Sequence, residues 1–166
     1  MDVSSGTARG DLPAGGSPVT ALVIGYGNTL CADDGVGPRA ADRLAADARV
    51  VALGARVLSV HQLTPELAAD VAEASVVVFI DASADASAAP GSVAVRAVEV
   101  GGGDSATSHH VGAGPLIAMA SELYGWAPET WIVSVGVASL ELGEPMPPVV
   151  EAALLSVVEA VVALLR

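Results

Sequence analysis

Residues 75–80 read Ser-Val-Val-Val-Phe-Ile, and this run is the most strand-like segment of the chain. It is apolar after its first residue and rich in β-branched side chains, which favours a strand covered on both faces. Such strands lie at the centre of sheets in proteins that alternate strands with helices. We therefore place residues 75–80 in the middle of an α/β sheet, with Asp81 ending the strand at its carboxyl end.

On either side of this run, short apolar segments alternate with amphipathic stretches. Further strands are predicted over residues 19–26, 56–60, 92–98 and 130–135, and helices over residues 35–46, 64–73, 108–124 and 148–165. The second of these helices is expected to begin with Thr64 as N-cap and Pro65 at the first helical position.

The link of residues 82–91 is too short for the helical crossover that joins parallel strands, so the 92–98 strand is predicted to run antiparallel. The expected fold class is α/β, with a mixed, mostly parallel five-stranded sheet, helices on both faces and one antiparallel strand.

Length and composition indicate one domain over residues 19–166. Residues 1–18 are rich in Gly, Ser, Ala and Pro and are predicted to be a disordered N-terminal leader. No apolar run is long enough to cross a bilayer. The single cysteine, Cys31, excludes an internal disulfide and suits the reducing cytoplasm, which is the expected location.

Charge excludes several classes of function. The formal net charge is −12, and all seven cationic side chains are arginines. So few cations cannot form a broad basic face, which argues against nucleic-acid binding. The absence of lysine excludes a P-loop lysine, a pyridoxal Schiff base and a lysine nucleophile.

Acidic side chains follow two of the predicted strands, and ligands of such sheets bind outside the carboxyl ends of the strands. Asp33 and Asp34 lie in the loop after the first strand, and Asp81 follows the third. Residues 99–108, extended, span about 33 Å, which is enough to return His109 to the same edge. Two carboxylates and one imidazole suit a divalent metal such as nickel or zinc.

Each of these residues also has a purely structural interpretation. Asp33 is best interpreted as a helix N-cap, and Asp34 as a possible partner of the helix dipole. Asp81 can be an Asx-turn residue, and His109 can be a first-turn histidine with His110 as its rival. Their convergence at one edge of the sheet is what favours a site.

Three other features near this edge have both a functional and a structural interpretation. The glycines of Gly25-Tyr26-Gly27 suggest a dinucleotide loop, but Leu30 stands where the third glycine should be and the acids that follow would repel a pyrophosphate. Cys31 lacks the electropositive surroundings of a reactive thiol and is interpreted as a packed or incidental side chain. His61 follows the second strand and fits either the rim of the site or an ordinary surface position.

Three stretches together carry a family resemblance. Residues 25–37 read GYGNTLCADDGVG, residues 77–82 read VVFIDA, and residues 108–112 read SHHVG. In this order they resemble the [NiFe]-hydrogenase maturation endopeptidases (peptidase family M52), over the chain from residue 21 to the C-terminus. Residues 61–67, HQLTPEL, are similar to the branch of that family that serves soluble bidirectional hydrogenases.

The resemblance implies a function and a site. By motif position, the family's three metal contacts fall on Asp34, Asp81 and His109, with His110 as the rival histidine. Family members remove the C-terminal extension of a hydrogenase large-subunit precursor after nickel insertion, and use the nickel in the precursor as a recognition element. Zinc or cadmium would substitute for nickel in vitro. Asp34 and Asp81 are the expected catalytic carboxylates, and the general base stays unassigned.

Two other classes of function remain open. One is a non-catalytic, metal-dependent assembly or binding module on the same fold, and the other is a dinucleotide-binding domain.

Overall fold

The computed structural model describes residues 19–83, 88–101, 111–138, 141–143 and 145–166. Within these residues the chain forms one sheet of five strands: β1 (Val19–Tyr26), β2 (Arg56–Val60), β3 (Ala74–Ser83), β4 (Val93–Ala97) and β5 (Glu129–Gly136). The helices are α1 (Val36–Ala45), α2 (Ala48–Ala52), α3 (Leu67–Ala72), α4 (Ala113–Tyr124) and α5 (Pro148–Leu164), and a short 3-10 helix, η1 (Ala32–Gly35), precedes α1. The predicted leader, residues 1–18, lies outside the described residues.

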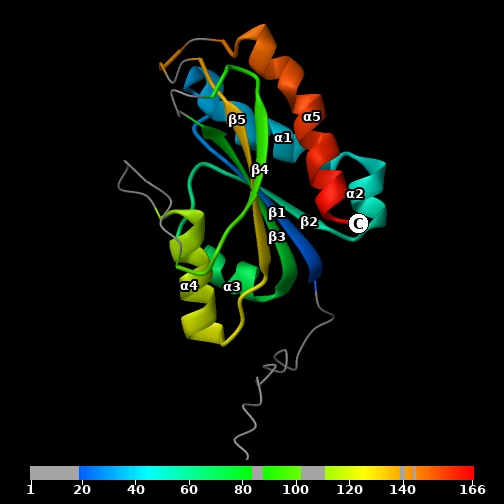
Figure 1. The fold of residues 1–166 in the computed structure, drawn as a ribbon, viewed down its shortest axis with the longest axis vertical. Helices are drawn as coiled ribbons and strands as arrows, with labels where there is room; N and C mark the ends of the chain where they lie inside the picture. The colour runs from blue at the N-terminus through cyan, green and yellow to red at the C-terminus, as the bar shows by residue number, and fades with distance from the viewer. Residues whose placement is uncertain (1–18, 84–87, 102–110, 139–140, 144) are drawn as a thin grey trace, which may run out of the picture.

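The strand order across the sheet is β2-β1-β3-β5-β4. β1 pairs in parallel with β2 and β3, and β3 pairs in parallel with β5. The predicted antiparallel strand is β4, which pairs with β5 at one edge of the sheet (Figure 1). The predicted fold class, a mixed and mostly parallel five-stranded sheet, is therefore confirmed.

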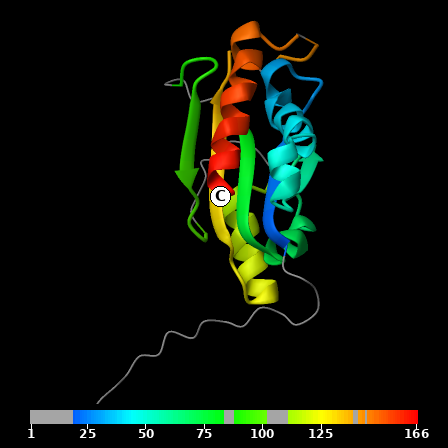
Figure 2. The ribbon, with the colours of Figure 1, turned by 90° about the vertical axis from the view of Figure 1, so that its right-hand side faces the viewer.

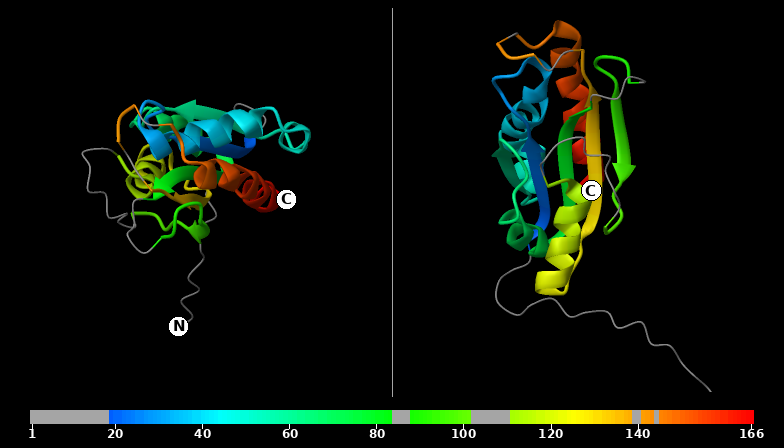
Figure 3. Two further views of the ribbon diagram at one scale, coloured as in Figure 1. Left: turned by 90° about the horizontal axis from the view of Figure 1, so that it is seen from above. Right: turned by 90° about the vertical axis from the view of Figure 1, so that its left-hand side faces the viewer.

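Helices cover both faces of the sheet, and a separate apolar core lies under each face. Helices α1 and α5 pack side by side over one face, which is turned toward the viewer in Figure 2. Helices α3 and α4 contact each other and cover the other face, with α4 in front in the right panel of Figure 3. No helix within the described residues is long and apolar enough to span a membrane.

The central strand β3 supplies both cores, as its sequence predicts. Val77 and Phe79 point into the core under α3 and α4, while Val78 and Ile80 point into the core under α1 and α5. All four side chains are fully buried. A strand buried on both faces needs apolar residues at every position, which explains the uninterrupted apolar run.

Three predicted boundaries were wrong. β3 does not end before Asp81 but continues through it to Ser83, in register with β5. Helix α4 begins at Ala113 rather than at residue 108, since its N-cap Gly112 has an extended backbone conformation. Helix α3 begins at Leu67, because residues 64–66 form a turn instead of its first residues.

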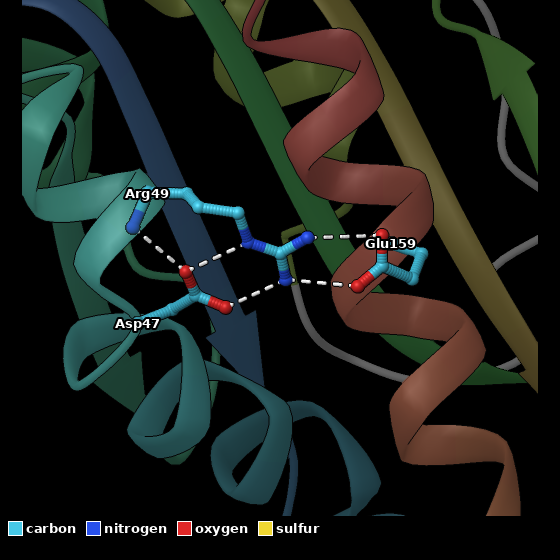
Figure 4. A network of polar contacts seen from close by, with 3 residues as sticks. All are labelled: Asp47, Arg49 and Glu159. Atoms are coloured by element: carbon cyan, nitrogen blue, oxygen red, sulfur yellow. Dashed lines mark hydrogen bonds and ion pairs between the residues drawn. The ribbon is translucent and has the colours of Figure 1, made fainter.

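The short helix α2 was not predicted. Its N-cap is Asp47, whose carboxylate accepts a hydrogen bond of 2.8 Å from the backbone N–H of Arg49. The Arg49 guanidinium then bridges Asp47 to Glu159 of α5, through hydrogen bonds between 2.8 and 3.0 Å (Figure 4). The hydrogen bonds from the side chain and backbone of Arg49 lower the pKa of Asp47 to about 2. The network ties α2 to the C-terminal helix.

Candidate functional site

The loop after β1 is shaped by glycines that leave no room for a side chain. Gly27 has a φ of +147°, and a Cβ on it would collide with the carbonyl oxygen of Asp34. A Cβ on Gly37 would collide with the carbonyl oxygen of Tyr26. The loop is thereby folded tightly against the end of β1, and α1 lies directly on the strand. Only glycine fits such close backbone approaches.

This conformation of the loop holds the Asp34 carboxylate against the loop backbone. The N–H of Asn28 donates a 2.7 Å hydrogen bond to Oδ2 of Asp34. Oδ1 of Asp34 makes no hydrogen bond within the described part of the chain, and the side chain is half-buried. Asp34 is thus an anchored carboxylate with one oxygen available at the carboxyl edge of the sheet.

The Asp81 carboxylate lies on the neighbouring strand. Gly25 of β1 pairs with Ile80 of β3, so the residues that follow them, Tyr26 and Asp81, lie side by side. The Tyr26 hydroxyl donates a 2.8 Å hydrogen bond to Oδ2 of Asp81. Asp81 is half-buried and points to the face of the sheet that α3 and α4 cover, as Phe79 does two residues earlier. The Asx-turn interpretation of Asp81 was wrong, because this residue lies within a strand.

Asp33 has a role that the sequence did not predict. It was expected to be an N-cap, but the N-cap positions of η1 and α1 are Cys31 and Gly35, and neither makes a side-chain capping bond. The Asp33 side chain is fully buried, and its Oδ2 accepts a 2.6 Å hydrogen bond from the N–H of Ala138. A buried carboxylate requires such donors, so Asp33 joins the loop after β1 to the loop after β5.

Two further backbone hydrogen bonds join the same two loops. The N–H of Ala32 donates to the carbonyl of Glu141, and the N–H of Gly143 donates to the carbonyl of Leu30, at 3.1 and 2.9 Å. Together these two bonds make an isolated antiparallel bridge between Cys31 and Leu142. We call these contacts, with the Asp33–Ala138 bond, the loop clamp.

The loop clamp leaves two leucines facing solvent. Leu30 is 70% exposed and Leu142 is 73% exposed, the two highest values among the large apolar side chains of the described residues. Leu30 is in the loop that carries Asp34, and Leu142 is in the loop after β5 that is bridged to it.

The structure brings two of the three predicted metal contacts to the same edge. Asp34 and Asp81 are bonded respectively to Asn28 and Tyr26, which lie two residues apart at the end of β1 (upper part of Figure 1). The third, His109, lies outside the described residues, as does its rival His110.

The described residues contain no cluster of three or more His, Cys, Asp or Glu side chains able to hold a metal. Two carboxylates, which accept hydrogen bonds from Asn28 and Tyr26, fit the oxygen part of the predicted ligand set. Whether His109 completes this set stays a prediction.

Two other residues, Cys31 and His61, were candidates for the site from the sequence. Cys31 is half-buried, and its sulfur accepts a 3.3 Å hydrogen bond from the side-chain amide of Asn28. No cationic group is among its hydrogen-bond partners in the described chain, in keeping with a packed thiol. His61 follows β2 and is exposed to solvent.

Sequence reasoning missed Tyr26 as part of the site. Tyr26 is the last residue of β1, which pairs with the strand that carries Asp81. That Tyr26 lies next to Asp81 follows only from the register of the two strands, which the sequence does not give.

No protein-family model and no curated protein sequence matches the chain. Solved structures do. The [NiFe] hydrogenase maturation protease HycI from Thermococcus kodakarensis KOD1 is 16% identical, with 89% of this chain and 92% of that chain covered and a TM-score of 0.71. The hydrogenase maturating endopeptidase HybD from E. coli is 24% identical, with the same coverage and a TM-score of 0.68.

A third structure has a higher sequence identity. The hydrogenase 2 maturation peptidase from Thaumarchaeota archaeon SCGC_AB-539-E09 is 26% identical over 88% of this chain and 97% of that chain, with a TM-score of 0.65. The branch serving soluble bidirectional hydrogenases is not distinguished by these neighbours and stays a prediction. The chain has the fold of the hydrogenase maturation proteases, and the resemblance to that family, first indicated by residues 25–37, is confirmed.

Proposed function

We propose that this protein is an endopeptidase that removes the C-terminal extension of a [NiFe]-hydrogenase large-subunit precursor after nickel has been inserted. The observation that carries the proposal is the pair of anchored carboxylates, Asp34 and Asp81, at the carboxyl edge of the sheet. This edge is where ligands of α/β sheets bind, and the fold is that of proteins named as hydrogenase maturation proteases.

In this proposal the nickel belongs to the precursor and is part of the substrate. Asp34 and Asp81, with His109, contact it when the precursor docks. Without a thiolate cage these oxygen and nitrogen ligands hold a metal weakly on their own, yet they complete the coordination of a metal that another protein presents. Zinc or cadmium is expected to occupy the same ligands in vitro. The protein would thereby cut only precursors that have already received their metal.

The reaction adds water to one peptide bond of the precursor. Hydroxide bonds to the carbonyl carbon, the C–N bond breaks, and the departing nitrogen takes a proton. Two routes fit the residues: a carboxylate that accepts the proton of the attacking water, and a metal that polarises the carbonyl. Asp34 and Asp81 are the carboxylates proposed for this work.

The side chains exposed by the loop clamp are consistent with a protein as the substrate. It holds two exposed leucines: Leu30 is in the loop that carries Asp34, and Leu142 is in the loop bridged to it. Apolar side chains next to a charged site suit a docked protein surface, which buries them while the carboxylates face the metal. The cytoplasm, where a nickel-loaded precursor would be processed, is the proposed location.

The test incubates purified full-length protein with the nickel-loaded precursor and follows the precursor mass. Loss of the C-terminal extension is expected with the wild-type chain, and not with Asp34→Asn or Asp81→Asn. Asp42→Asn is the matched control, because Asp42 is an exposed aspartate on α1, away from the strand ends.

His109→Ala is expected to abolish processing, while His110→Ala is expected to retain it. The reverse result would assign the metal contact to His110.

Other outcomes identify the competing classes. Binding of the precursor without a mass change would show a non-catalytic assembly module. Retention of NAD or FAD through purification would favour a dinucleotide-binding domain and overturn the proposed function.

A further inference from the structure

We propose that Tyr26 is a positioning residue that fixes the orientation of the Asp81 carboxylate for the precursor and its metal. This inference rests on the proposed function, because it assigns Asp81 a part in the site. It concerns a residue that touches Asp81 rather than the substrate.

The sheet itself brings Tyr26 and Asp81 together. β1 and β3 are parallel neighbours, and the last pair in their register is Gly25 with Ile80. The next residue on each strand points to the face under α3 and α4. The phenol hydroxyl then reaches Oδ2 of Asp81 at 2.8 Å, which is an ordinary length for a hydrogen bond between two oxygens.

Packing holds the phenol ring in place. The ring of Tyr26 meets that of Phe79 edge to face, with centroids 6.4 Å apart and planes at 82°. Phe79 is fully buried and cannot move aside. On its other side β1 is paired with β2, where Tyr26 is opposite Val60.

The Tyr26 backbone is equally confined, because α1 approaches it so closely at Gly37 that a Cβ there would collide with its carbonyl oxygen. Both the ring and the backbone that carry the hydroxyl are therefore fixed before any partner arrives.

A fixed donor changes what Asp81 can do. An aspartate carboxylate has a broad, two-fold preference about its last torsion, so a half-buried one samples several orientations. A hydrogen bond from Tyr26 selects one of them and lowers the entropic cost of engaging a metal or a peptide. Donors that orient a metal-binding side chain typically contribute 10- to 100-fold to affinity or activity.

The substitution that isolates this effect is Tyr26→Phe. It removes the hydroxyl and keeps the ring that packs on Phe79. Processing of the nickel-loaded precursor is expected to fall about tenfold in kcat/KM. The thermal midpoint should stay close to that of the wild type. Tyr124→Phe is the matched control: Tyr124 is the other tyrosine of the chain, lies at the end of α4 and is 49% exposed.

A second measurement does not depend on catalysis. Calorimetric titration of the full-length protein with Cd²⁺ or Ni²⁺ is expected to show binding about tenfold weaker in Tyr26→Phe than in the wild type. In an Asp81→Asn background, the additional Tyr26→Phe change should have no further effect on metal binding, since the group that Tyr26 orients has lost its charge.

The outcomes separate this inference from the proposed function. If the wild type processes the precursor and Tyr26→Phe does so at the same rate, Tyr26 does not position Asp81. If the wild type leaves the precursor intact but Tyr26→Phe still weakens metal binding only when Asp81 is present, the proposed function fails and the positioning role stands. A wild-type protein that neither processes the precursor nor binds metal would overturn both.

Discussion

The carboxylate of Asp33 accepts a 2.6 Å hydrogen bond from the backbone N–H of Ala138, which lies 105 residues further along the chain. The bond crosses from the loop after β1 to the loop after β5, and the Asp33 side chain is fully buried. The acid next to Asp34 is therefore a structural residue. The two adjacent aspartates therefore have different roles: Asp33 supports the loop, and Asp34 is available to a partner.

Asp33→Ala is expected to lower the free energy of unfolding by about 1–3 kcal/mol, because it leaves the Ala138 N–H without its acceptor. Asp33→Asn keeps an acceptor oxygen and should cost less. Denaturant titration measures both, with Asp42→Ala on the exposed face of α1 as the control. Equal stability of Asp33→Ala and the control would mean that the bond to Ala138 contributes nothing.

Gly27→Ala is expected to destabilise the protein more than Gly54→Ala. Both glycines have a positive φ, +147° and +67°, so both changes introduce backbone strain of about 1–3 kcal/mol. A Cβ on Gly54 meets nothing within 4 Å, whereas one on Gly27 collides with the backbone of Asp34. Chemical denaturation of the two variants gives the difference. Similar midpoints would show that the loop around Asp34 yields to the new methyl group.

Replacing both exposed leucines of the loop clamp, Leu30→Ser with Leu142→Ser, is expected to raise the KM for the precursor about tenfold. A tenfold change corresponds to about 1.4 kcal/mol, which burial of part of one leucine side chain supplies. The kcat should not change, because neither leucine is proposed to act on the peptide bond. Leu155→Ser is the control, since Leu155 is 68% exposed on α5. An unchanged KM in the double variant would remove these leucines from the docking surface.

The Asp47–Arg49–Glu159 network predicts a specific dependence of stability on pH. Hydrogen bonds from Arg49 lower the pKa of Asp47 from 3.8 to about 2 in the folded protein. A carboxyl whose pKa is depressed by folding stabilises the protein above its unfolded pKa, and this contribution is lost as the pH falls through the folded pKa. The stabilisation should therefore be complete above about pH 5 and disappear toward pH 2.

Asp47→Asn is the variant for this measurement, because asparagine keeps the N-cap acceptor and removes the charge. Thermal midpoints of wild type and variant should differ most above pH 5 and converge as the pH approaches 2. Because the network is exposed, added salt should reduce the difference. A difference that does not change with pH would mean that the charge of Asp47 is immaterial.

Much of the fold is predictable because burial imposes a pattern on single strands. The short, β-branched apolar run at residues 75–80 favours a strand covered on both faces, and it lies in β3; β1 and β2 have the predicted bounds. These elements are short, continuous and bounded by turns, so a local pattern suffices. The antiparallel direction of β4 followed from the length of one link, which is also local information.

The contacts that shape the site escaped prediction for a different reason. Ala138 provides only a backbone N–H, which every residue except proline has, so nothing in its sequence marks it as the partner of Asp33. The Tyr26–Asp81 bond depends on the register of two strands. Helix α2 has two adjacent valines, which lower helix propensity, and it is supported by the long-range bonds of Arg49. In each case the missing information is tertiary.

The loop clamp also has a bearing on the order of folding. The loop that carries Asp34 is synthesised early, yet its partners in the loop clamp are Ala138, Glu141, Leu142 and Gly143. During translation, the residues of this loop are complete long before the loop can adopt its folded conformation. Domains generally fold as units once the required chain has emerged, so the carboxylates are expected to become a working pair only after β5 and its following loop are free. A translation product arrested before residue 138 would therefore contain every residue of the motif in its first loop but lack the loop clamp. We expect such a product not to bind the proposed precursor.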